Sequence, residues 1–279
     1  MAGIESRDVS IPVRGARWFA RRVVERPLQL RIEQDHNNQE RNGLPKAEGL
    51  SKDGHGIVVV FNHFSARDPV EILDFIFGNP VMRHKPVLSP VAYHMYTDRE
   101  GFWETPGEFL DISFCPIVTE ETMKLGRNKG YPLGYGMKEY FEGAVTTLQK
   151  GGIVMAAPQG TRREFLGDST KPIIGTLIAQ TDHKKKKFIE TDHEYKKLDS
   201  YGLLFVGLGI KDANDYQKQN VGGLNPFKEY QLTIGPTFTK KEVMDAVGGE
   251  YREVDPWVFE QLNKIVPTVY RNPINRITD

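Results

Sequence analysis

A histidine and an aspartate five positions apart, His63 and Asp68 in VVVFNHFSARDPVEIL, are placed to transfer a proton. An imidazole whose Nδ1–H is held by a carboxylate has a fixed tautomer and presents Nε2 as a general base. No serine lies in a G-x-S-x-G elbow, so the attacking nucleophile would be a hydroxyl of the substrate. In the alternative interpretation, Asp68 serves only as the N-cap of the helix that Pro69 begins.

A second segment, GGIVMAAPQGTRREF, combines a short apolar run with glycine and arginine. Residues 153–157 predict a buried strand, and residues 158–163 predict the turn that follows it. Gly160 allows backbone amides to approach a ligand closely and to form an anion-binding nest. Arg162 and Arg163 carry fork-shaped donors that suit a phosphate group. The alternative is a strand end followed by two solvated arginines.

Together the two segments resemble sequence blocks of the glycerolipid acyltransferases, the lysophospholipid or 1-acylglycerol-phosphate acyltransferases. Residues 62–68 match the family's N-H-x-x-x-x-D block, and residues 158–163 resemble its P-E-G-T-R-S block. The resemblance extends from about residue 15 to about residue 245, although only these two blocks are specific. It implies that a fatty acyl group moves from acyl-CoA or acyl-carrier protein to a hydroxyl of a glycerol phosphate or lysophospholipid. His63 would be the base and Asp68 its orienting partner, without an acyl-enzyme.

The resemblance also implies a substrate-binding role for the second block, which comprises Gln159, Gly160, Thr161, Arg162 and Arg163. Backbone amides around Gly160 and Thr161 would hold the oxyanion, and Arg162 would bind the phosphate of the acceptor. Gln159 stands where the family usually has glutamate, so the acceptor pocket carries one negative charge less.

A further departure concerns the family's intermediate block, which has a phosphate-binding arginine. The corresponding stretch, ISFCPIVTEETMK, has no arginine at the expected strand end. Lys124, Arg127 or Lys129 would have to replace it, and the sequence does not choose among them.

The apolar runs at residues 57–61 and 153–157 predict strands, and residues 137–149 predict a helix between them. Alternation of this kind favours an α/β fold with its ligand site at strand ends. The resemblance implies a single mixed-sheet domain of glycerolipid acyltransferase type over residues 41–279, flanked by helices and preceded by an N-terminal helical segment, residues 1–40.

Two local patterns complete these predictions. Residues 34–56 are polar and rich in Asn, Gly and Lys, which predicts a loop or a surface hairpin. Asp255 followed by Pro256 predicts the cap and start of a final helix over residues 257–265.

The composition limits the classes of partner. The chain has 37 basic and 37 acidic residues, so no global field would recruit nucleic acid. No stretch approaches the ~18 uninterrupted apolar residues of a membrane span. A lipid substrate therefore requires an element that docks on the bilayer from one side. The lone Cys115 excludes an internal disulfide and suits the reducing cytoplasm. Together with the docking element, this predicts a cytoplasmic protein that is peripheral on the inner face of the membrane.

Three segments are candidates for surface contacts. Residues 13–26 predict a helix with an apolar face and a basic face, which either lies on anionic lipid or packs its apolar stripe on the core. The lysine run at residues 184–187 is either a solvated face or a contact for anionic lipid or a carrier's phosphates. The glycine- and tyrosine-rich residues 126–136 either flank the pocket or form a plain loop.

The triplet Thr-Asp-His occurs at residues 181–183 and 191–193, but no further ligand joins it. We therefore expect neither a metal site nor a cofactor, with the thioester serving as donor substrate. Two other functions remain open: a lipid ester or thioester hydrolase in which His63 activates water, and a non-catalytic lipid-binding module.

Overall fold

The computed structural model describes residues 31–33, 43–64, 68–97, 110–160, 166–167, 172–182, 200–210 and 230–267. Within these residues the chain forms a seven-stranded sheet in the order β1-β7-β6-β2-β5-β3-β4. The strands are β1 (Arg31–Glu33), β2 (Gly56–Phe61), β3 (Val87–Ala92), β4 (Ile112–Ile117), β5 (Ile153–Ala156), β6 (Tyr201–Ile210) and β7 (Tyr230–Thr239). Neighbouring strands run parallel except β6 and β7, which are antiparallel, so the sheet is mixed as expected.

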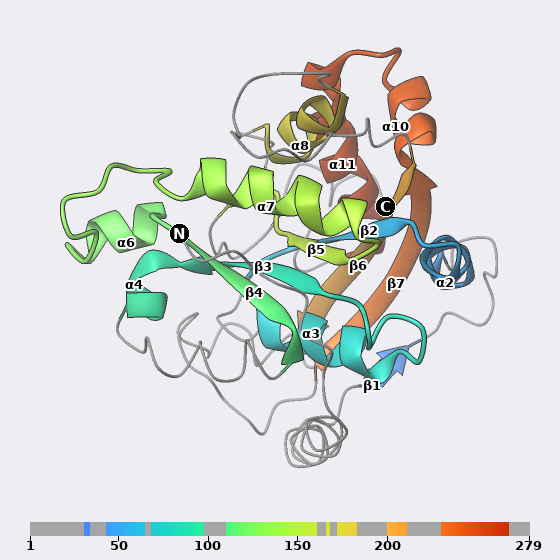
Figure 1. The fold of residues 1–279 in the computed structure, drawn as a ribbon, viewed down its shortest axis with the longest axis horizontal. Helices are drawn as coiled ribbons and strands as arrows, with labels where there is room; N and C mark the ends of the chain where they lie inside the picture. Colours follow the sequence, from blue (N-terminus) through green and yellow to red (C-terminus); the bar gives the residue numbers. More distant parts are fainter. Residues whose placement is uncertain are drawn as a thin grey trace.

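The helices flank this sheet. They are α2 (Leu44–Lys52), α3 (Asp68–Gly78), α4 (Tyr93–Thr97), α6 (Glu120–Lys124), α7 (Met137–Gln149), α8 (Ile173–Asp182), α10 (Lys240–Ala246) and α11 (Tyr251–Ile265). Figure 1 shows α7, α8 and α11 on one side of the sheet and α3 on the other. An α/β fold with one mixed sheet flanked by helices is therefore confirmed.

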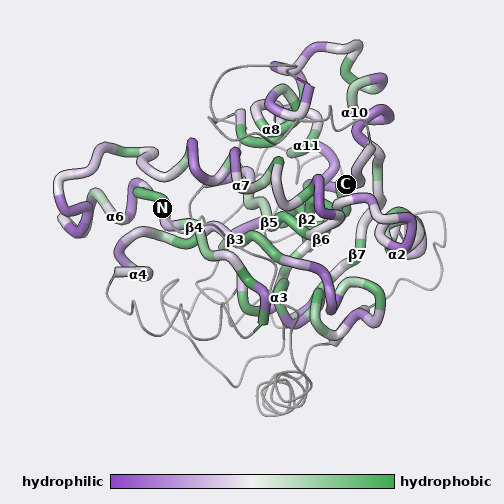
Figure 2. The backbone as a smooth tube through the Cα atoms, viewed as in Figure 1, coloured by the Kyte–Doolittle hydropathy of each residue, from purple (hydrophilic) through white to green (hydrophobic). Residues whose placement is uncertain are grey.

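The centre of the sheet explains the apolar runs of the sequence. β2 lies between β5 and β6, and every residue of β2 is buried. Val58 stands opposite Val154 of β5 and Leu203 of β6. A strand covered on both faces has a continuous hydrophobic sequence rather than an alternating one. Figure 2 shows the hydrophobic positions gathered on these central strands. The strands predicted at residues 57–61 and 153–157 correspond to β2 and β5, and the helix predicted at residues 137–149 is α7.

The loop or hairpin predicted over residues 34–56 is wrong where the structure describes this stretch, because it contains the helix α2. Pro45 lies in the first turn, where its missing N–H costs no helical hydrogen bond. Ala47 is fully buried, and Leu50 lies directly over Gly202 of β6, where a side chain at Gly202 would collide with it. Tertiary packing of these few apolar residues outweighs the polar composition of the segment.

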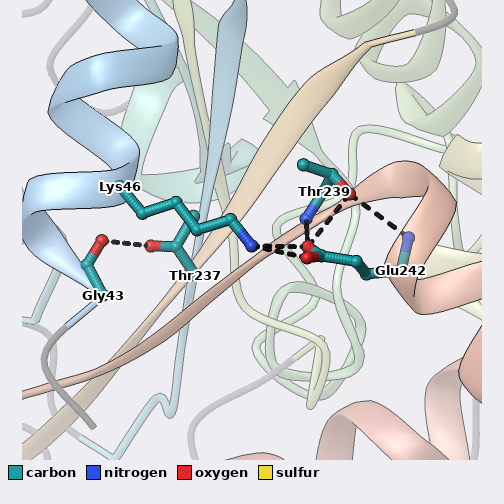
Figure 3. Close-up of polar contacts among 5 residues, drawn as sticks. All are labelled: Gly43, Lys46, Thr237, Thr239 and Glu242. Atoms are coloured by element: carbon teal, nitrogen blue, oxygen red, sulfur yellow. Dashed lines mark hydrogen bonds and ion pairs between the residues drawn. The ribbon is translucent and has the colours of Figure 1, made fainter. Parts of the chain in front are cut away.

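Side-chain contacts fix the N-terminal end of α2 to the C-terminal part of the chain (Figure 3). The Thr237 hydroxyl donates to the Gly43 carbonyl at 2.7 Å, and Lys46 Nζ donates to Glu242 at 2.6 Å. Glu242 also forms a capping box with Thr239 at the start of α10. Glu242 therefore links the start of α10 to α2.

The expected role of Asp255 is also wrong. α11 begins at Tyr251, so Asp255 and Pro256 lie inside that helix rather than before it. The Asp255 carboxylate is buried and accepts the first three N–H groups of α8, from Ile173, Ile174 and Gly175, at 3.0, 2.9 and 2.8 Å. Asp255 therefore caps a different helix, one that begins 82 residues earlier in the chain.

The N-terminal segment, residues 1–40, is described only at Arg31–Glu33, which form β1 and pair in parallel with β7. The predicted basic helix at residues 13–26 and the lysine run at residues 184–187 lie outside the described residues. Among the residues that are described, no helix has the length and apolar character needed to cross a membrane.

Candidate active site

The site forms where two adjacent parallel strands end. β2 and β5 run side by side, and the residues that follow them are Asn62-His63 and Ala157-Pro158-Gln159-Gly160. Because the carboxyl ends of parallel strands meet at one edge of a sheet, the described first residues of the two blocks, 62–64 and 158–160, are brought together. His63 and Gly160 line the same cavity.

The histidine and the aspartate are in direct contact. His63 Nδ1 lies 3.0 Å from Asp68 Oδ2, and the Phe64 N–H donates to the same oxygen at 2.7 Å. Asp68 is fully buried at the start of α3, while the His63 side chain is 19% exposed. His63 Nε2 has no hydrogen-bond partner among the described residues. A buried carboxylate thus fixes one ring nitrogen, and the other remains available to a substrate.

The end of β2 is itself held in place by an asparagine. Asn62 Nδ2 donates to the Leu208 carbonyl at 2.9 Å, and the Leu208 N–H donates to Asn62 Oδ1 at 2.7 Å. Asn62 is buried. Its amide side chain continues the hydrogen bonding between β2 and β6 by one residue beyond the last strand position, which fixes the backbone from which His63 projects.

Gln159 supports the same turn from the other side. Its side-chain Oε1 accepts the His63 N–H at 2.7 Å, and Gln159 is buried. The sequence predicted a substrate-binding role for this residue, and its contact with the His63 backbone was missed. The only signal for it was the expectation that the ligand site lies at strand ends.

The cavity that His63 enters is predominantly apolar. Its volume is about 160 Å³, well above the roughly 10–15 Å³ that one water molecule requires. Its polar lining residues include Ser89, Thr119 and Glu121. Tyr140 also lines the cavity, but its hydroxyl donates a hydrogen bond to the Met155 carbonyl at 2.8 Å. A hydrocarbon chain suits such a lining. The apolar lining residues include Val70, Leu73, Val91, Met95, Phe114 and Ile117.

The turn after β5 differs from its expected role in one respect. Gly160 has a φ of 67°, which favours glycine, and its N–H donates to the Ala157 carbonyl at 2.9 Å. This amide is engaged within the turn, so it is not the oxyanion donor that the sequence suggested. Thr161, Arg162 and Arg163 lie outside the described residues.

The three candidates for the intermediate-block arginine do not line the cavity. Lys124, Arg127 and Lys129 are exposed on the end of α6 and the loop after it. The residues of this region that do line the cavity are Thr119 and Glu121. The predicted phosphate contact from Lys124, Arg127 or Lys129 is therefore not seen in this cavity.

Across the described ranges, no group of three or more His, Cys, Asp or Glu side chains is arranged to hold a metal ion. In the first Thr-Asp-His triplet, Asp182 has protein partners: it accepts from Lys240 Nζ at 2.5 Å and from the Tyr251 hydroxyl at 2.7 Å. This carboxylate joins α8 to α10 and α11.

The chemistry that the described side chains can carry out is abstraction of a proton by His63 next to a cavity suited to a hydrocarbon chain. Comparison of the sequence with protein-family models and with curated proteins finds no match.

Proposed function

We propose that this protein is an O-acyltransferase that moves a fatty acyl group from acyl-CoA or acyl-carrier protein to a hydroxyl of a glycerol phosphate or lysophospholipid. The observation that carries the proposal is the contact of His63 Nδ1 with the buried Asp68 carboxylate, beside an apolar cavity. The acyl chain would occupy this cavity. The protein would act at a membrane surface on the cytoplasmic side.

In the proposed reaction, His63 Nε2 takes the proton of the acceptor hydroxyl as its oxygen attacks the thioester carbonyl. The tetrahedral intermediate collapses with cleavage of the C–S bond. The imidazolium then returns its proton to the departing thiolate, so the products are an ester and a free thiol. Asp68 keeps the proton on Nδ1 in the resting state and stabilises the imidazolium in between.

The remaining roles belong to the turn after β5. We assign the acceptor phosphate to Arg162 and Arg163 and an oxyanion contact to Thr161, because their residue types suit these tasks. Gln159 is a positioning residue in this scheme, since it contacts the backbone of His63 rather than a substrate.

The test is mass spectrometry of products after incubation with acyl-CoA and a panel of lysophospholipids and glycerol 3-phosphate. An acylated acceptor and free CoA are expected. His63→Ala should lower the rate by a factor of about 10² to 10⁴, the usual contribution of a general base. His55→Ala is the matched control, because His55 directly precedes the other end of β2 and does not line the cavity. Wild-type transfer by His63→Ala would refute the mechanism.

A hydrolase is the second candidate, because the partial exposure of His63 gives water access to the base. Loss of the thioester without any acylated product would select hydrolysis. Vesicle binding without turnover of any thioester would instead identify a non-catalytic lipid-binding module.

A further inference from the structure

One edge of the molecule carries an exposed apolar surface between α6 and α7. We call residues 123–135 the 123–135 surface. Among the described residues, six large hydrophobic side chains are exposed, and five belong to this surface. Leu133 and Leu125 are 51% and 50% exposed. The five are Met123, Leu125, Tyr131, Leu133 and Tyr135. A concentration of this kind marks a surface for a partner or a membrane.

The surface is built on defined contacts. The rings of Tyr131 and Tyr135 stack with centroids 4.0 Å apart, and Tyr93 meets both edge-on at 5.5 and 6.2 Å. Backbone hydrogen bonds of 2.9 Å join Val118 to Gly134 and to Tyr135. The tyrosine side chains are therefore preorganised on the outside of the protein.

The charged side chains within residues 123–135 are all basic. Lys124, Arg127 and Lys129 lie within it and are exposed, and no acidic residue occurs between positions 123 and 135. Over the whole chain basic and acidic residues balance at 37 each, so this local excess is a distinct feature. A positive surface favours an anionic partner.

The surface adjoins the cavity. Tyr93 is the first residue of α4, which also supplies the cavity-lining Met95. Glu121 of α6 and Met137, the first residue of α7, line the cavity from either end of the surface. Figure 1 shows α4, α6 and the loop before α7 together at the left edge of the molecule.

We propose that the 123–135 surface docks on a bilayer containing anionic lipid. Leu125 and Leu133 enter the headgroup boundary, the tyrosines lie at the level where aromatic residues concentrate, and the basic side chains contact headgroups. This orientation places the cavity next to the lipid phase. The choice of a bilayer over an acidic protein rests on the proposed function, which requires access to a membrane lipid.

The first test reports on the surface itself. Cys115 is the lone cysteine and is buried, and burial raises its thiol pKa to about 12, so an engineered thiol can be labelled selectively. An environment-sensitive dye on Leu133→Cys should show a blue shift with vesicles of phosphatidylcholine and phosphatidylglycerol. The same dye on Lys52→Cys, at the exposed end of α2, should not.

The second test measures affinity by vesicle flotation of the full chain. The double variant Lys124→Gln, Lys129→Gln should bind anionic vesicles about 25-fold more weakly than the wild type, because each basic side chain contributes about fivefold to the affinity. The control, Lys52→Gln with Lys150→Gln, removes the same charge from exposed positions elsewhere and should bind as the wild type.

Three results would overturn the proposal: no vesicle binding, vesicle binding without a blue shift at position 133, or a blue shift with an acidic carrier protein but not with vesicles. None of these measurements requires turnover. Docking can therefore fail while acyl transfer is observed, and acyl transfer can fail while docking is observed.

Discussion

At the scale of single residues, the turn that carries His63 is held by three hydrogen bonds. Asp68 accepts from the ring of His63 and from the N–H of Phe64, and Gln159 accepts from the N–H of His63 itself. The ring position therefore depends on a side chain from a different strand end. Small displacements of a catalytic group cost rate even where the group itself is intact.

Gln159→Leu removes the acceptor of the His63 N–H and leaves that buried donor without its partner. We expect a loss of about 1–3 kcal/mol in the free energy of unfolding and, for the proposed acyl transfer, a fall in kcat that exceeds any change in KM. Gln159→Glu retains the acceptor but adds a negative charge beside His63. Negative charge favours the protonated imidazole, so the acid limb of the pH–rate profile should shift to higher pH. An unshifted profile together with wild-type kcat for Gln159→Leu would remove the positioning role.

The sequence predicted the contact of His63 with Asp68 because both residues lie within one strand-to-helix turn. It did not predict the contact of His63 with Gln159 or that of Asn62 with Leu208, since the partners are 96 and 146 positions apart. Such pairs depend on strand order. Two other strands, β3 and β4, lie between β2 and β5 along the chain, and residue patterns do not specify that β2 pairs with β5 and β6.

At the scale of elements, Asp255 connects two helices. Its carboxylate accepts three N–H groups of α8, where negative charge also interacts favourably with the helix dipole. Burial acts in the opposite direction and raises the pKa of Asp255, because it disfavours the charged form.

Asp255→Ala removes these three acceptor contacts and leaves backbone donors without a partner. We expect the free energy of unfolding to fall by about 3 kcal/mol, measured by urea denaturation. Asp245→Ala is the control, because Asp245 has an exposed ion pair with Lys241, which contributes little. Equal stabilities of the two variants would contradict the capping role.

The elements predicted well were those with long apolar runs or clear amphipathic periodicity, namely β2, β5 and α7. α2 was mistaken for a loop because only Ala47 and Leu50 among its central residues are apolar, and its stability comes from packing on β6 and β7. The pair Asp255-Pro256 has the local pattern of a helix start, yet α11 begins one turn earlier. The Asp255 carboxylate instead caps α8. Local patterns identify a capping residue but not the helix that it caps.

At the scale of the whole molecule, the lone thiol reports on the integrity of the core. Cys115 is buried in β4, and burial, together with the nearby Glu139, raises its pKa to about 12. An unfolded thiol ionises near pH 8.5. Because the unfolded state loses this proton first, Cys115 makes the free energy of unfolding decrease as the pH rises above about 8.5.

We expect iodoacetamide at pH 8 to alkylate Cys115 at least about a hundredfold more slowly in the native protein than in urea, as followed by intact-mass spectrometry. Between pH 9 and 10, the free energy of unfolding of the wild type should fall with pH more steeply than that of Cys115→Ala. The difference between the two slopes should approach about 1.4 kcal/mol per pH unit. Native alkylation at the rate of an unprotected thiol would show that β4 opens readily.

The pairing of β1 with β7 has a consequence for work with shortened forms of the protein. β7 is a ten-residue strand whose other side is occupied by β6, and Arg31–Glu33 cover part of its outer side. A fragment beginning at residue 41, the apparent domain start in the sequence, would expose those backbone N–H and C=O groups to other chains. Uncovered strand edges recruit further strands, so self-association of that fragment would reflect the cut and not the native assembly.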